Sequence, residues 1–140
     1  MTETTLKITR SITVAAGRER VWQAITTPGQ IGQWFEKLEF ARLAVGEPIQ
    51  FSWGEKGEIA IVEPMDRFGF RWQIAPPNAA RTLVIFELET VPEGTRITVT
   101  EQGFEALPDE VREIHVKNNT QGWEKLLDEL IAYVQAGSHD

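Results

Sequence analysis

The sequence contains no cysteine, so disulfide bonds and thiolate chemistry are excluded. It has only two histidines, His115 and His139, and no cluster of carboxylates at metal-ligand spacing, so we expect no metal site. A phosphate-binding loop of the G-x-x-x-x-G-K type, a dinucleotide fingerprint and a serine in a nucleophile-elbow context are also missing. The sequence therefore predicts no cofactor and offers no recognisable catalytic motif.

Positive charge is scarce in this chain. It carries 14 Lys and Arg residues against 21 Asp and Glu residues, for a net charge of -7, and the basic residues form no run. Because proteins that bind a phosphate backbone carry a basic face, nucleic acid is not an expected partner. No segment reaches the length of a membrane-spanning helix, and residues 1–10 lack the apolar core of a signal peptide. We expect a cytoplasmic protein that does not insert into membranes.

The most regular feature is a predicted helix near the C-terminus, in a chain whose 140 residues fit one domain spanning 1–140. The apolar residues that recur there at steps of three and four are Trp123, Leu126, Leu127, Leu130 and Val134. Asn119 extends this stripe, whereas Lys125, Asp128 and Glu129 lie off it. A helix with one apolar face needs a broad apolar surface opposite it. The tail at 136–140 is expected to be frayed.

The rest of the chain supplies that surface as a series of strands. Residues 6–14 alternate as a strand, with Arg10 on the apolar face, where we expect a strand end or a charged partner. Two short helices follow, one on each side of Pro28-Gly29. From Phe40 to Gly103 the pattern has a period of two, interrupted by turn signals at 54–57, 64–66, 76–78 and 92–94. This order predicts an α+β domain, with a curved antiparallel sheet of about six or seven strands wrapped around the last helix.

Three segments resemble a known family. RVWQAITTPGQIGQWF, GTRITVTEQGF and NNTQGWEKLLDEL, at 20–35, 94–104 and 118–130, resemble motifs of START-like (SRPBCC) domains, in the branch named after the activator of the heat-shock chaperone ATPase. The resemblance spans nearly the whole chain and implies a helix-grip fold with a cavity between the sheet and the last helix. In the family many members bind small apolar molecules such as lipids or polyketides. Others are polyketide cyclases or aromatases, and some stimulate a chaperone ATPase.

Aromatic side chains are the strongest candidates for ligand contact. Strand parity places Trp53 and Trp72 at the ends of apolar faces, and a tryptophan offers a large area and one N–H donor. The predicted ligand-binding residues are Trp34, Phe35, Phe51, Trp53, Phe70, Trp72, Phe86, Asn119, Trp123 and Leu127. Packing of these rings in an ordinary core is the alternative. Asn119 lies on a buried face, so its amide needs a partner, which a ligand, a water molecule or a loop backbone would provide.

Two residues are candidates for proton transfer. Glu101 shares a strand face with Ile97 and Val99, where a desolvated carboxylate suits an acid or base; the alternative is a position at the rim of the sheet. His115 lies early in the last helix, at the edge of the apolar stripe, and the alternative there is a surface or capping histidine.

The interpretation that these patterns favour is binding of a small hydrophobic or aromatic molecule between sheet and helix. The first alternative is a co-chaperone-like interaction module, with a chaperone as partner. The second is a cyclase, aromatase or hydrolase that uses Glu101 or His115. A binder or enzyme is expected to have an internal cavity lined by Trp53, Trp72 and Trp123, whereas an interaction module is expected to be solid, with an exposed apolar patch.

Overall fold

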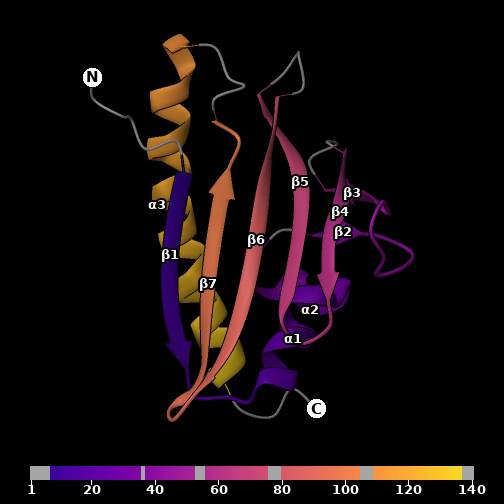
Figure 1. Ribbon diagram of the computed structural model, residues 1–140, viewed down its shortest axis with the longest axis vertical. Coiled ribbons are helices and arrows are strands. Elements are labelled where there is room, and N and C mark those ends of the chain that lie inside the picture. The colour runs from indigo at the N-terminus through magenta and orange to yellow at the C-terminus, as the bar shows by residue number, and fades with distance from the viewer. Residues whose placement is uncertain (1–6, 36, 53–55, 76–79, 105–108, 137–140) are drawn as a thin grey trace.

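A computed structural model describes residues 7–35, 37–52, 56–75, 80–104 and 109–136 (Figure 1). It shows a curved antiparallel sheet with a long helix, α3, lying across one face, and two short helices near one end of the sheet. The predicted α+β fold class is confirmed. Several predicted features lie outside the described residues. They are Trp53, His139, residues 54–55 of the first expected turn, the turn at 76–78, and residues 137–140 of the expected frayed tail.

The sheet contains seven strands in the order β1-β7-β6-β5-β4-β3-β2, and every neighbouring pair is antiparallel. The strands are β1 Lys7–Val14, β2 Leu38–Glu39, β3 Pro48–Phe51, β4 Lys56–Glu63, β5 Arg67–Ala75, β6 Ala80–Val91 and β7 Gly94–Gln102. The helices are α1 Arg18–Thr26, α2 Pro28–Trp34 and α3 Asp109–Gln135. The chain therefore runs as a meander from β2 to β7, and the first strand, β1, pairs with the last strand, β7.

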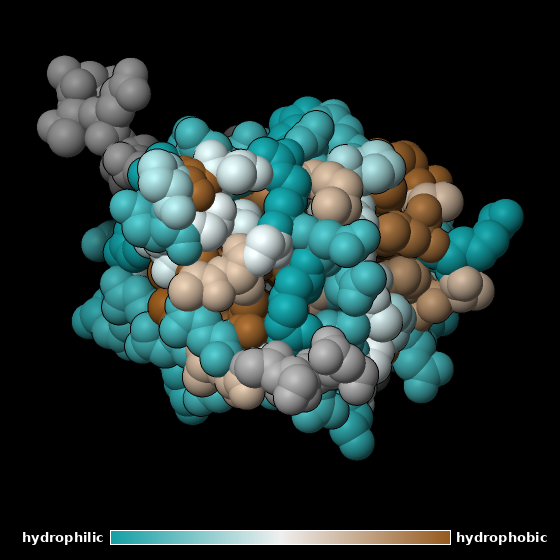
Figure 2. Space-filling model, turned by 90° about the horizontal axis from the view of Figure 1, so that it is seen from below, coloured by the Kyte–Doolittle hydropathy of each residue, from teal (hydrophilic) through white to brown (hydrophobic). Residues whose placement is uncertain are grey.

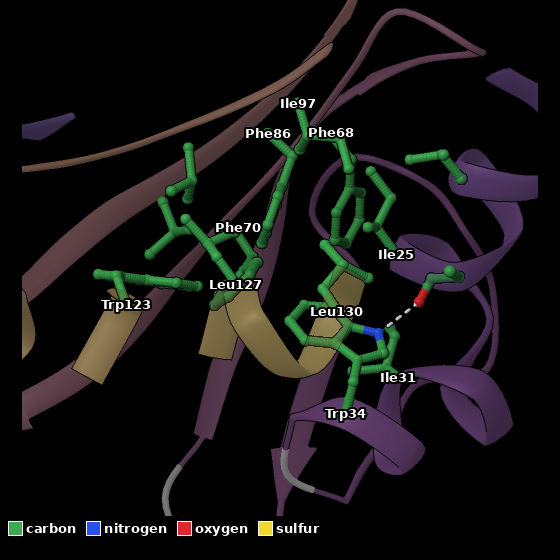
Figure 3. Packing of buried hydrophobic residues seen from close by; sticks show 14 of the residues in the cluster. Ile25, Ile31, Trp34, Phe68, Phe70, Phe86, Ile97, Trp123, Leu127 and Leu130 are labelled. Carbon is green, nitrogen blue, oxygen red and sulfur yellow. Dashed lines mark hydrogen bonds between the residues drawn. The ribbon is translucent and has the colours of Figure 1, made fainter. Parts of the chain in front are cut away.

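The two short helices form a corner that is fixed by proline and tryptophan. Pro28 is the first residue of α2, where its fixed φ suits a helix and its missing N–H costs no hydrogen bond. Trp34 at the end of α2 is buried, and its indole N–H donates to the carbonyl oxygen of Ala24 in α1 at 2.9 Å (Figure 3). The side chain of one helix thereby holds the backbone of the other.

Helix α3 presents the predicted apolar face to the sheet. Trp123, Leu127 and Leu130 are buried with residues of the sheet and of the two short helices (Figure 3), whereas Lys125 is exposed. Arg10, the charged residue on the apolar face of β1, pairs with Glu124 of α3 at 3.2 Å, so the expected charged partner is present. Within the described residues, no helix has the length and apolar character needed to cross a membrane.

Two local predictions were wrong. The first concerns where the strands resume after the short helices. They were expected from Phe40 onward, but β2 ends at Glu39 and β3 begins only at Pro48. The second concerns Gly57, which was expected in a hairpin loop but lies in β4 opposite Trp72. A Cβ atom on Gly57 would lie 2.2 Å from the carbonyl oxygen of Arg71, so glycine here permits close approach of two strands and does not form a turn.

The helix face yields a direct stability test. Leu127→Ala is expected to lower the free energy of unfolding by about 2–5 kcal/mol, because it removes a buried side chain and leaves a cavity. Lys125→Ala, on the exposed side of the same turn, is expected to change it by about 0.5 kcal/mol or less. Urea unfolding of both variants measures the difference, and equal losses would mean that the helix faces are wrongly assigned.

Candidate functional site

Aromatic rings from five elements of the fold meet between the sheet and the helices. Trp72 of β5 lies 5.5 Å from Phe70, 6.0 Å from Phe51 of β3 and 6.1 Å from Trp123 of α3, measured between ring centroids. Phe86 of β6 approaches Trp123 edge-on at 5.8 Å. We call this set, with Trp34, Phe35 and Phe68, the aromatic cluster. Such spacings are those of favourable aromatic contacts, so the rings pack on one another.

Phe35 occupies a distinctive place in the aromatic cluster. Its ring is nearly parallel to the Trp34 ring, at 5.6 Å and 26°, and to the Trp123 ring, at 6.0 Å and 23°. It also contacts the Trp72 ring at 5.6 Å. Phe35 directly follows α2 and is only partly buried, so it lies where the aromatic cluster reaches the surface.

A buried carboxylate lies beside these rings. Glu101 in β7 has a relative exposure of 0%. Its Oε1 accepts the indole N–H of Trp123 at 2.8 Å, and its Oε2 accepts the indole N–H of Trp72 at 2.9 Å. The Asn119 amide donates to both oxygens at 3.2 Å, and the Thr82 hydroxyl donates to Oε2. We call Glu101 and these four donors the Glu101 cluster.

Register and helical periodicity together bring the donors to the carboxylate. Glu101 is opposite Val84 in β6, so Thr82, two residues earlier in β6, shares its face of the sheet. Trp72 of β5 is directly opposite Thr82 of β6. Asn119 and Trp123 are four residues apart in α3 and therefore lie on one side of the helix. The Glu101 cluster thus joins β5, β6, β7 and α3 through one side chain.

The partners of Glu101 are all uncharged. An ionised carboxylate only accepts hydrogen bonds, and an indole N–H only donates, so the donors and acceptors are matched in kind. Among the described residues, no lysine or arginine forms an ion pair with Glu101. Charge-assisted hydrogen bonds from neutral donors therefore compensate the burial of this carboxylate.

The structure places the predicted site residues in three groups. Those whose rings form the aromatic cluster are Trp34, Phe35, Phe51, Phe70, Trp72, Phe86 and Trp123. Leu127 is buried in the core beside them. Asn119 has a protein partner, Glu101, so its amide gives no evidence for a cavity. The rings expected to line a cavity contact one another, and Trp53 is outside the described residues.

The two candidates for proton transfer differ in their surroundings. Glu101 is enclosed and not at the rim of the sheet, and its oxygens already accept from four side chains. His115 is partly buried on α3, and in the described part of the chain it forms no side-chain hydrogen bond. Sequence reasoning missed Thr82 and Phe68. Thr82 carried a usable signal, because it is a polar residue in phase with Val84 and Phe86.

A groove of about 500 Å³ lies beside the aromatic cluster, between α2 and strands β2 and β3. Gly29 and Gly32 of α2 line one side of the groove and, having no side chains, keep it wide. Lys37 and Glu39 place charges along it, and Phe51 belongs to both the groove and the aromatic cluster. The groove therefore runs from solvent to one ring of the candidate site.

The curved seven-stranded sheet, the long C-terminal helix and the helical corner define a START-like helix-grip protein, a ligand-binding fold. The chain belongs to the family of activator of Hsp90 ATPase homolog 1-like proteins, whose sequence model matches residues 15–135. No curated protein sequence matches the chain.

Solved structures support the same fold. Protein MLL2253 from Mesorhizobium loti matches with a TM-score of 0.79 and 24% identity, over 94% of this chain and 98% of that one. The Aha1 dimer from Colwellia psychrerythraea matches with a TM-score of 0.76 and 21% identity, over 96% and 99%. DynU16, a protein of the dynemicin biosynthetic locus, matches with a TM-score of 0.77 and 26% identity. The match covers 96% of this chain and 49% of DynU16.

The Glu101 cluster predicts a large effect from a nearly isosteric change. In Glu101→Gln, an NH₂ group replaces one acceptor oxygen and faces N–H and O–H donors. The free energy of unfolding is therefore expected to fall by about 1–3 kcal/mol. Glu89→Gln is the control, because Glu89 is exposed and pairs with Arg96 on the surface; a loss of about 1 kcal/mol or less is expected. Urea unfolding compares the two, and equal stability of both variants would contradict the role assigned to Glu101.

Proposed function

We propose that this protein binds a small hydrophobic or aromatic molecule between the sheet and α3, at the edge of the aromatic cluster. The observation that carries the proposal is the Glu101 cluster, a single polar centre enclosed by aromatic rings. Binding sites for small molecules combine large apolar walls with a few placed polar groups that fix orientation. Phe35, Trp72 and Asn119 are partly exposed, so this edge is accessible from solvent.

Other observations support binding over a purely structural role. Burying a carboxylate in an aromatic interior is expensive, and an apolar residue at position 101 would fill the same space without that cost. A polar centre is useful when an incoming molecule has to be oriented. One structural relative, DynU16, comes from a biosynthetic locus, which fits a fold that handles small molecules.

A ligand screen with variants tests the proposal. Aromatic, acyl and polyketide-like compounds are expected to include some that raise the thermal midpoint in a concentration-dependent way, because ligands that bind only the folded state stabilise it. Trp72→Ala is expected to weaken binding of those compounds more than Trp22→Ala, since Trp22 belongs to α1, in the helical corner. Tryptophan fluorescence titration gives the affinities. If no compound class stabilises the parent protein, the binding proposal fails.

A second function, a co-chaperone-like interaction module, is favoured by a different observation. Leu43 and Val45, between β2 and β3, are 37% and 67% exposed. Figure 2 shows apolar side chains gathered at the edge of the molecule on the same side as these strands. Exposed apolar groups of this kind occur at protein contact sites, and the family is named after an ATPase activator.

The interaction module has its own test. If this surface contacts a chaperone, added protein is expected to stimulate the ATPase of an Hsp90-type chaperone, and Val45→Asp to abolish the stimulation by placing a charge in the contact. Ile114→Asp is the matched control, since Ile114 is 58% exposed on α3. Absence of stimulation by the parent, or equal loss in both variants, would contradict this function.

A further inference from the structure

The Phe35 ring has the surroundings expected for a bound planar molecule. Trp34 and Trp123 both contact it with nearly parallel ring planes, at angles of 26° and 23°. The Trp72 ring also contacts it, at 5.6 Å between ring centroids. Phe35 itself is partly exposed, whereas Trp34 and Trp123 are buried at 4% and 2% exposure. The two tryptophan rings are therefore enclosed, and the Phe35 ring that packs on both is accessible from outside; we call the place of the Phe35 ring the slot, and the tryptophan rings in contact with it its walls.

The walls of this slot are connected to the Glu101 carboxylate. Trp72 and Trp123, which contact the Phe35 ring, both donate their N–H groups to Glu101. The weakest of the donors to Glu101 by distance is Asn119, which shares its amide between both oxygens at 3.2 Å. Asn119 is partly exposed, unlike Thr82 and Trp123. It is thus the donor that an incoming group replaces most easily.

We propose that the site takes a planar aromatic molecule carrying a hydrogen-bond donor, a phenol or an arylamine. Its ring occupies the place of the Phe35 ring, in contact with Trp34 and Trp123, and its O–H or N–H donates to Glu101 in place of the Asn119 amide. This inference rests on the proposed function and specifies its ligand class. Phe35 is then a side chain that fills the empty slot and moves out on binding.

The same chemistry predicts what the site rejects. An ionised Glu101 carboxylate accepts hydrogen bonds and donates none, so a ligand carboxylate at that position would meet a like charge and no donor. Among the described residues, Glu101 has no cationic partner to share with such a ligand. The protein's net charge of -7 adds to the repulsion. Aromatic and fatty acids are therefore expected to be excluded from this position.

Three probes of one shape separate these expectations. Calorimetric titration of the intact protein with 2-naphthol, 2-methoxynaphthalene and 2-naphthoate compares a donor, a neutral group without a donor, and an anion. 2-Naphthol is expected to bind at least about tenfold more tightly than the other two, because a hydrogen bond to a charged acceptor is worth that factor. Equal affinities, or tighter binding of 2-naphthoate, would overturn the inference and leave the proposed function intact. Absence of binding by all three would also overturn the inference, whereas the proposed function fails only if no compound class of the wider screen binds.

Matched variants test the position of the ligand. Phe35→Ala is expected to raise the affinity for 2-naphthol, because the ligand ring no longer competes with a protein ring. Phe40→Ala, which removes a ring of the same size outside the aromatic cluster, is expected to leave that affinity unchanged. Asn119→Ala is expected to preserve the preference for 2-naphthol over 2-methoxynaphthalene. Weaker 2-naphthol binding in Phe35→Ala, or loss of the preference in Asn119→Ala, would overturn the inference.

Discussion

The hydrogen bonding of one buried carboxylate is the constraint on which the interior depends. Glu101 is withdrawn completely from water, and its burial is tolerated only because donors from β5, β6 and α3 converge on it. Two of those donors are indole N–H groups, so the carboxylate orients the Trp123 ring and, together with the Thr82 hydroxyl that also accepts the Trp72 N–H at 2.9 Å, the Trp72 ring. Other rings of the aromatic cluster pack against these two indoles, whose N–H groups are held by hydrogen bonds.

This arrangement reconciles a well-packed interior with a binding function. A cavity is not required in advance if one ring of the aromatic cluster acts as a removable occupant, and Phe35 has the position and partial exposure for that role. The rigid part of the site is formed by the sheet and α3, while the replaceable part comes from the end of a short helix. Family membership is compatible with this function and with a protein-binding one, because fold alone does not determine which site is used.

Sequence patterns predicted most of the fold because burial on one face imposes a period. The stripe in α3 and the alternation in β1, β5, β6 and β7 identified their buried faces, and parity placed Glu101 on the apolar side. The donors to Glu101 were not predictable in the same way. They depend on cross-strand register, which sets Trp72 opposite Thr82, and alternation along one strand does not encode register. Gly57 shows the same limit, since a glycine signals a turn and a close strand approach equally well.

The measurement that tests the central role of Glu101 most directly is hydrogen exchange at the indole N–H groups, followed by NMR. The account predicts that the Trp72 and Trp123 indole protons exchange slowly in the parent, and that both exchange faster in Glu101→Gln. The Trp34 indole proton, bonded to the Ala24 carbonyl, is expected to keep its protection in both proteins. Unchanged protection of Trp72 and Trp123 in Glu101→Gln would contradict the account, because the carboxylate would then not be what holds the two rings.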